Sequence, residues 1–156
     1  MARGMVSGIY VDLEKQAVLL VENANPKKPP GWGLPGGRIT KYDKTPKSAL
    51  LREWEEETGT KALNVELFLE MERQRKYIHY FFIVGKIDRN LRTTGVPNET
   101  GPPKWIPLEK IATRKMRIYW QHLNALYRYL CRRLAIENIN AAFIAAKIAR
   151  NYNKEM

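Results

Sequence analysis

Residues 45–59 constrain the fold most, because they mark both ends of a helix and concentrate acidic side chains inside it. The stretch "TPKSALLREWEEETG" begins with Thr45, whose hydroxyl can cap a helix, and continues with Pro46 at the first helical position. Gly59 is placed to end the helix in the left-handed conformation. Four glutamates occupy the five positions from 53 to 57, and the glycine-rich segment "WGLPGG" precedes the helix. The sequence therefore predicts a glycine loop followed by an acidic helix.

Three of these glutamates share one face of the predicted helix. At 100° per residue, Glu56 and Glu57 lie within about 60° of Glu53, whereas Glu55 points elsewhere. Each like-charged pair at this spacing costs roughly 0.2–0.5 kcal/mol, and acids near a helix C-terminus are disfavoured as well. The costs can be offset in two ways. One is a charged helix end paired with Arg52; the other is a divalent cation such as Mg²⁺ or Mn²⁺, which prefers carboxylate oxygens.

The segment "GGRITKYDKTPKSALLREWEEETGT" resembles the Nudix box, which has the form Gly, five residues, Glu, seven residues, Arg-Glu-U-x-Glu-Glu-x-Gly-U, where U is bulky and apolar. The second half of the box matches in order and spacing through Arg52, Glu53, Trp54, Glu56, Glu57 and Gly59. The "WGLPGG" segment and Trp105 also stand where Nudix domains commonly have them. The first half departs from the pattern, since it carries one extra residue and Asp43 replaces its Glu. Thr60 replaces the closing apolar residue.

The resemblance implies a metal-dependent hydrolase that attacks a phosphoanhydride with water. It places metal ligands on Glu53, Glu56, Glu57 and the carbonyl of Gly36. Arg52 would orient the glutamates. A general base has two candidates, Glu53 and Glu99, because some family members use an acid in the loop before the strand that carries the tryptophan. Glu99 stands six residues before Trp105.

The substrate is less defined by the sequence. Tyr77 follows Thr60 by 17 residues, a distance at which a tyrosine marks dinucleoside-polyphosphate hydrolases in this family, although strand packing explains it as well. The nearby bases Arg73, Arg75 and Lys76 could bind additional phosphates. We expect a nucleoside triphosphate or a dinucleoside polyphosphate as substrate. An RNA 5′-end pyrophosphohydrolase and a catalytically inactive Nudix-fold module that binds nucleotide or RNA are the alternatives.

The whole chain of 156 residues suits a single α/β domain. Strands are predicted over 8–22 and 64–87, and a long polar loop follows at 88–104. The resemblance to Nudix domains implies a core at 1–115 that forms an α/β/α sandwich around a mixed sheet. Residues 116–156 read as two amphipathic helices packed on the same domain, and the chain is expected to be a monomer or homodimer.

Charge and composition limit the partners. Residues 104–156 hold 11 Lys and Arg against 3 Asp and Glu, a net of +8 out of the total of +11. This excess favours a polyanionic partner, and nucleic acid stays an alternative to a small nucleotide.

No apolar run reaches the roughly 18 residues of a membrane span, and the N-terminus lacks a signal-peptide core. We therefore expect a cytoplasmic protein.

The chain has only two histidines, His79 and His122. His79 falls in an alternating strand and could face the substrate. His122 falls in the first C-terminal helix, where we expect it on the surface. Neither residue is assigned a catalytic role from the sequence.

Overall fold

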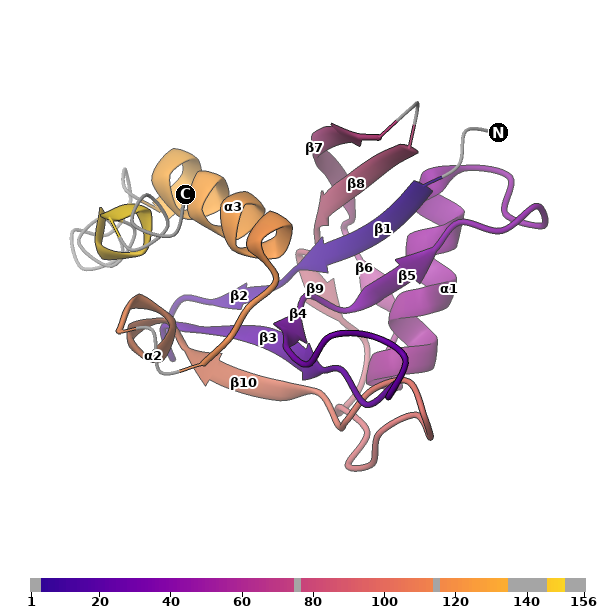
Figure 1. Cartoon of the computed structure of the whole chain (residues 1–156), viewed down its shortest axis with the longest axis horizontal. Coiled ribbons are helices and arrows are strands. Elements are labelled where there is room, and N and C mark those ends of the chain that lie inside the picture. The colour runs from indigo at the N-terminus through magenta and orange to yellow at the C-terminus, as the bar shows by residue number, and fades with distance from the viewer. Residues whose placement is uncertain (1–3, 75–76, 114–115, 135–145, 151–156) are drawn as a thin grey trace.

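The computed structural model describes residues 4–74, 77–113, 116–134 and 146–150 (Figure 1). The predicted phosphate-binding residues Arg75 and Lys76 lie outside these residues, as does most of the second predicted C-terminal helix. Among the described residues, no helix has both the length and the apolar content needed to cross a membrane.

The elements alternate between strands and helices along the chain. The strands are β1 (Gly4–Ile9), β2 (Val11–Asp12), β3 (Ala17–Glu22), β4 (Trp32–Gly33), β5 (Gly36–Arg38), β6 (Ala62–Leu63), β7 (Glu66–Arg73), β8 (Tyr77–Ile83), β9 (Lys86–Ile87) and β10 (Lys104–Pro107). The helices are α1 (Pro46–Thr58), α2 (Leu108–Ala112), α3 (Trp120–Tyr129) and the π-helix η1 (Leu130–Leu134).

The main sheet is mixed, as the sequence predicted. Its strand order is β5-β1-β8-β7, with β1 parallel to β8 and antiparallel to β5, and β7 antiparallel to β8. A second sheet has the order β10-β3-β2, with β4 paired to β3. Because β5 is the edge strand next to α1, the glycine loop and the acidic helix lie side by side (Figure 1).

Helix α1 begins and ends where its sequence predicts. The hydroxyl of Thr45 accepts a hydrogen bond from the backbone of Ser48, and the Ser48 side chain bonds back to the Thr45 backbone. Pro46 opens the helix, and Gly59 ends it with φ at 74°. These caps hold the glutamates in the last turns of the helix, close to the sheet.

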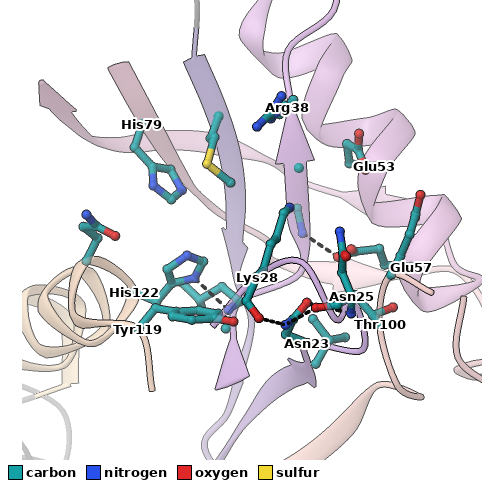
Figure 2. A pocket seen from close by; sticks show the side chains of 18 of the residues that line it. Asn23, Asn25, Lys28, Arg38, Glu53, Glu57, His79, Thr100, Tyr119 and His122 are labelled. Carbon is teal, nitrogen blue, oxygen red and sulfur yellow. Dashed lines mark hydrogen bonds between the residues drawn. The ribbon is translucent and has the colours of Figure 1, made fainter. Parts of the chain in front are cut away.

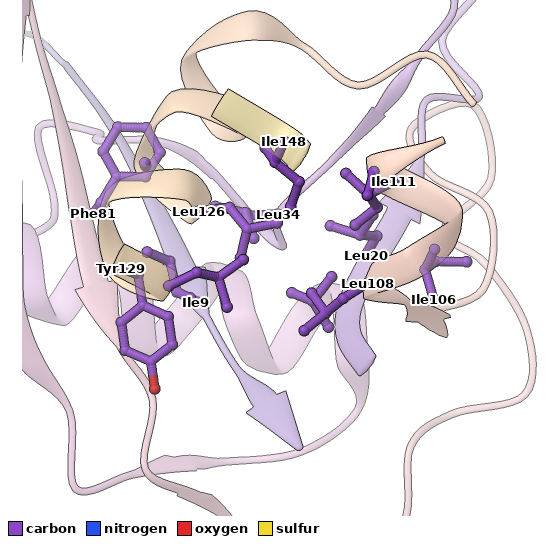
Figure 3. Packing of buried hydrophobic residues seen from close by; sticks show 14 residues of the cluster. Ile9, Leu20, Leu34, Phe81, Ile106, Leu108, Ile111, Leu126, Tyr129 and Ile148 are labelled. Carbon is purple, nitrogen blue, oxygen red and sulfur yellow. The ribbon is translucent and has the colours of Figure 1, made fainter. Parts of the chain in front are cut away.

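Two apolar clusters cover opposite faces of the strands, since neighbouring side chains on a strand point to opposite sides. Val6 and Phe82 belong to the cluster under α1, which also contains the fully buried Trp54. Ile9 and Phe81 belong to the other cluster, which α2 and α3 cover (Figure 3). The result is a layered arrangement of helices on both sides of mixed strands, the fold class that the sequence predicted.

Helix α3 contributes its apolar face to the second cluster. Its inward residues are Ala125, Leu126 and Tyr129, and Leu130 of η1 continues them. The start of this helix therefore lies against the domain core, where it forms one wall of the pocket described next.

Candidate active site

One pocket of about 1040 Å³ lies between the glycine loop, α1, β8 and the start of α3. The acidic residues Glu53 and Glu57 lie on one side of it, and His79, His122 and Tyr119 lie on the other (Figure 2). The pocket thus has an acidic end and an aromatic end, which come from different parts of the chain.

The glutamates of α1 differ in their exposure. Glu57 is only 7% exposed, Glu53 is partly buried, and Glu56 points into solvent with 52% of its side chain exposed. Burial raises the pKa of Glu57 to about 8, with a contribution from the neighbouring carboxylates of Glu53 and Glu99 and against the hydrogen bond from the Gly36 N–H. Burial also raises the pKa of Glu53. Burial therefore disfavours the charged forms of Glu53 and Glu57.

Arg52 connects the acidic helix to the preceding loop. Its Nη1 donates to Glu53 at 2.8 Å and to Glu56 at 3.5 Å, while its Nε and Nη2 donate to the buried Asp43 at 3.1 and 2.9 Å. Its hydrogen bonds to Asp43 lower the pKa of that carboxyl to about 2. Arg52 is therefore positioned to orient Glu53, while Asp43 anchors the arginine itself.

The two glycines of "PGG" allow the loop to approach its neighbours closely. The backbone N–H of Gly36 donates to Glu57 Oε1 at 2.8 Å. A Cβ atom at Gly36 would collide with the carbonyl of Val6 on β1, and a Cβ atom at Gly37 would collide with the Glu53 carboxylate. Only glycine fits at position 36, because the obstacle there is backbone, whereas a side chain at position 37 would displace the Glu53 carboxylate.

The residues at the acidic end suit a divalent cation. Their donors are carboxylate oxygens, which hard cations prefer, and Glu57 is a buried acid whose pKa is raised by its surroundings. Within the described residues, no three His, Cys, Asp or Glu side chains converge as a metal site. Glu53 and Glu57 are instead engaged by hydrogen bonds from Arg52 and from the Gly36 N–H.

Glu99 lies at the acidic end as well. It lines the pocket from the loop between β9 and β10, with an exposed side chain. Its backbone carbonyl accepts from the N–H of Ala24 at 2.9 Å, which ties this loop to the segment after β3. Glu53 and Glu99, the two candidates for the general base, therefore border the same space.

The predicted substrate-binding residues lie farther along the same pocket, so far as they are described. Tyr77 and Arg73 both line it. When the amide of Gln121 is oriented with its oxygen toward Arg73, that oxygen accepts from Arg73 Nε at 2.9 Å and Nη2 at 2.6 Å. Arg73 is thereby held beside α3, close to His79 and His122.

The expectation that His122 lies on a helix surface is wrong. His122 is only 8% exposed, because the face of α3 that carries it packs over the sheet. Its Nδ1 accepts a hydrogen bond from the backbone N–H of Leu34 at 2.9 Å. Nothing in the local pattern distinguished this histidine from a surface residue, since the contact joins segments 88 residues apart.

The fold and site define a class: an α/β protein in which a glycine loop and an acidic helix border a nucleotide-sized pocket. The model of the NUDIX domain matches residues 2–128, so the chain belongs to the Nudix hydrolase family. Its members hydrolyse pyrophosphate bonds and generally use a divalent metal ion. No curated protein matches the sequence significantly.

Solved structures support the same fold. A MutT protein from a study of Aliivibrio salmonicida and Vibrio cholerae superposes with a TM-score of 0.66 and 18% identity, covering 81% of this chain and 94% of that one. A MutT Nudix hydrolase from Burkholderia pseudomallei gives 0.67 at 18% identity, covering 81% and 96%. The NUDIX domain of Shewanella oneidensis NrtR, complexed with ADP ribose, gives 0.65 at 20% identity, covering 81% and 84%.

Proposed function

We propose that the protein is a Mg²⁺- or Mn²⁺-dependent pyrophosphohydrolase that cleaves a phosphoanhydride bond in a nucleotide. The observation that carries this proposal is Glu57, a buried carboxyl whose pKa is raised and which accepts a hydrogen bond from the Gly36 N–H. It lines a pocket large enough for a nucleotide. Nucleoside triphosphates and dinucleoside polyphosphates are the substrates that we expect. The ADP ribose in the NrtR structure supports a nucleotide-type ligand for this fold.

The metal would be held by the carboxylates of Glu53, Glu56 and Glu57 and by the carbonyl of Gly36. A bound divalent cation acidifies coordinated water and neutralises charge on phosphate oxygens. The chain itself supplies orientation: Arg52 holds Glu53 through a bond of 2.8 Å, and the Gly36 N–H holds Glu57 through another of 2.8 Å. Positioning of this kind accounts for much of the rate acceleration in phosphoryl transfer.

The general base is either Glu53 or Glu99. Glu53 already accepts a hydrogen bond from Arg52, which favours its charged form and leaves one oxygen for other partners. Glu99 has an exposed carboxylate on a loop, so its side chain is free to turn toward a bound water. Loss of a general base lowers the rate about 10²- to 10⁴-fold. We therefore expect only one of Glu53→Gln and Glu99→Gln to remove the acidic limb of the pH–rate profile.

Basic side chains around the pocket would bind the phosphate chain. Arg38 and Lys28 line the pocket from two different segments, and Arg73 lines it close to the two histidines. Tyr77 lines it from the start of β8, where its ring could pack against a ligand. Arg38 and Lys28 would neutralise phosphate charge that the metal does not reach.

An RNA 5′ end is the second candidate substrate. Trp120, at the start of α3, lines the pocket and leaves 53% of its surface exposed. An exposed tryptophan offers a base of a single strand a surface for stacking. A protein that bound RNA with strong salt dependence but without turnover would instead be the binding module considered above.

The test is product analysis on nucleoside triphosphates, dinucleoside polyphosphates and 5′-triphosphorylated RNA, with Mg²⁺ or Mn²⁺. Turnover should disappear with a chelator and should fall at least about 100-fold in Glu56→Gln. Glu55→Gln is the matched control, because Glu55 is an exposed glutamate on another face of the same helix. Absence of metal-dependent turnover on every substrate would overturn the proposal.

A further inference from the structure

The aromatic end of the pocket contains two buried imidazoles that the proposed chemistry does not use. His79 is 0% exposed and His122 is 8% exposed, and their ring centroids are 5.1 Å apart. Both rings lie on the side of the pocket opposite Glu53 and Glu57 (Figure 2). The ring nitrogens that have no partner within the described residues indicate what this end of the pocket can bind.

The tautomer of His122 follows from its contact with the backbone. Its Nδ1 accepts from the Leu34 N–H at 2.9 Å and therefore carries no proton in the neutral ring. The ring proton is then on Nε2, which has no hydrogen-bond partner within the described residues. Because burial lowers the pKa of His122 to about 4, the ring stays neutral at pH 7. His122 thus offers a single N–H donor.

The tautomer of His79 follows from its contact with Ser7. The Ser7 hydroxyl lies 2.7 Å from His79 Nε2, and Ser7 is only 1% exposed. If Nε2 were the donor, the hydroxyl proton would have no acceptor among the described residues. The hydroxyl therefore donates to Nε2, and the ring proton is on Nδ1. That Nδ1 is buried without any hydrogen-bond partner, which is a costly state for a donor.

The surroundings of the two donors suit a flat heterocycle better than an anion. His79 stacks on Phe81 at 4.0 Å, and Tyr119 packs beside His122 at 5.8 Å between ring centroids. Burial lowers the pKa of both imidazoles, so neither ring adds positive charge. The one cation close to both rings, among the residues described, is Arg73, which Gln121 engages with two hydrogen bonds.

We propose that this end of the pocket binds the substrate's nucleobase, and that His79 and His122 select a base edge with two adjacent hydrogen-bond acceptors. Guanine presents such an edge through N7 and O6, whereas adenine places an amino donor beside N7. The assignment rests on the proposed nucleotide substrate and deepens it. His79 and His122 are thus specificity-determining residues, and Ser7 is a positioning residue that sets the tautomer of His79.

Nitrogen-15 NMR of the imidazoles tests the assignment directly, because the chain has only two histidines. The free protein should show two neutral rings of opposite tautomer, with the proton on Nδ1 in His79 and on Nε2 in His122. Single substitutions at each histidine assign the signals. The opposite tautomer at either ring would overturn the donor pattern.

Titration with ligands then identifies what the rings contact. The probes are the α,β-methylene analogues of GTP, ATP, CTP and UTP, and inorganic tripolyphosphate, all with Mg²⁺. The GTP analogue should shift both imidazole signals and bind at least about tenfold more tightly than the ATP analogue and tripolyphosphate. Tripolyphosphate should shift backbone amides at the acidic end of the pocket, those of Gly36 and Gly37 among them, and should leave both imidazole signals unchanged. Imidazole shifts caused by tripolyphosphate, or equal affinity for all four nucleotides, would overturn the proposal.

A substitution at His79 distinguishes binding of the nucleobase from binding of the phosphates. His79→Phe keeps a ring against Phe81 but removes the donor, and Ser7→Ala can be added so that no hydroxyl is left unpaired. The double variant should lose about tenfold in affinity for the GTP analogue while its affinity for tripolyphosphate stays unchanged. Unchanged affinity for the GTP analogue would contradict a role for His79.

If the wild type neither binds nor hydrolyses any nucleotide, the proposed function itself fails. That result differs from nucleotide binding without contacts to the base, which would overturn only the base assignment.

Discussion

At the scale of single residues, the acidic site depends on one arginine and two glycines. Arg52 is held by Asp43 through two hydrogen bonds and in turn holds Glu53. Gly36 and Gly37 leave room for the loop to lie against the glutamates. The Nudix box of this chain departs from the family pattern at Asp43, yet the shorter acid still reaches Arg52. Two substitutions test these roles separately.

Asp43→Asn should lower the free energy of unfolding by about 2 kcal/mol, because hydrogen bonds to a charged group contribute roughly 1.5–3 kcal/mol. Asp43 is 7% exposed, so the loss is not recovered by water. Chemical denaturation followed by circular dichroism measures the change. Asp12→Asn is the control: its nearest cation, Lys15, is 4.0 Å away and itself exposed, so the substitution should cost under about 0.5 kcal/mol.

Gly37→Ala should reduce kcat about 10²-fold while the protein stays folded. The added methyl group meets the carboxylate of Glu53, which is the end of a side chain that can shift. A displacement of about 1 Å at a reacting centre is enough for such a loss. Gly101→Ala serves as the matched substitution, since its added Cβ would find its nearest neighbour at 3.8 Å. Equal activity of the two variants would show that the position of Glu53 does not matter.

At the scale of the element, α1 is a helix whose ends are set by local chemistry and in whose acidic last turns Arg52 is the basic partner of Glu53 and Glu56. There is no basic residue in its last turn. The helix is held instead by its capping box at Thr45, by Trp54 in the core and by the left-handed Gly59. The caps therefore offset part of the repulsion among the glutamates.

Removing the N-cap hydroxyl of Thr45 should show how much the stability of α1 depends on its cap. Thr45→Ala should lower the free energy of unfolding by about 1 kcal/mol, because it removes the hydroxyl that accepts from the Ser48 N–H. Thr45→Ser keeps the hydroxyl and should behave like the wild type. Thermal unfolding of the three proteins measures the difference, and equal melting temperatures would mean that the cap contributes nothing.

At the scale of the whole molecule, two neutral histidines are buried against Phe81 of the second cluster, which links the stability of the fold to pH. The folded pKa of His122 is about 4 and its ordinary value is 6.5. Between these values the unfolded chain binds a proton at His122 that the folded chain does not. The wild type should therefore lose about 1.4 kcal/mol per pH unit at this residue as the pH falls below 6.5.

The comparison with His122→Asn isolates this contribution, because Glu57 and Glu53 titrate with the opposite sign in the same range. Asparagine keeps an acceptor for the Leu34 N–H but does not titrate. The stability advantage of the wild type at pH 8 should shrink steadily from pH 6.5 to pH 4. Parallel stability curves for the two proteins would contradict a neutral buried His122.

The limits of α1 were predictable from the sequence, since caps and helical faces depend on residues within about four positions of each other. The family and the mixed α/β class were predictable from the resemblance to the Nudix box. The Nudix match through residue 128 extends beyond the core predicted at 1–115, which remains a prediction as a domain boundary. The roles of Glu53, Glu56, Glu57, Glu99 and Gly36 also remain predictions, although the structure brings them to one pocket or its edge.

Contacts between distant segments were decided by the tertiary structure alone. The sequence showed three glutamates on one face, but their different burial depends on where β5 and the loop to β10 meet that face. It also contained two unremarkable histidines, 43 positions apart. They become neighbours because His122 of α3 contacts the rings of His79 and Phe81 on β8 and bonds to the Leu34 backbone. Local chemistry thus determined the acidic helix, whereas burial, which is a property of the packed chain, determined the pKa values and the second end of the pocket.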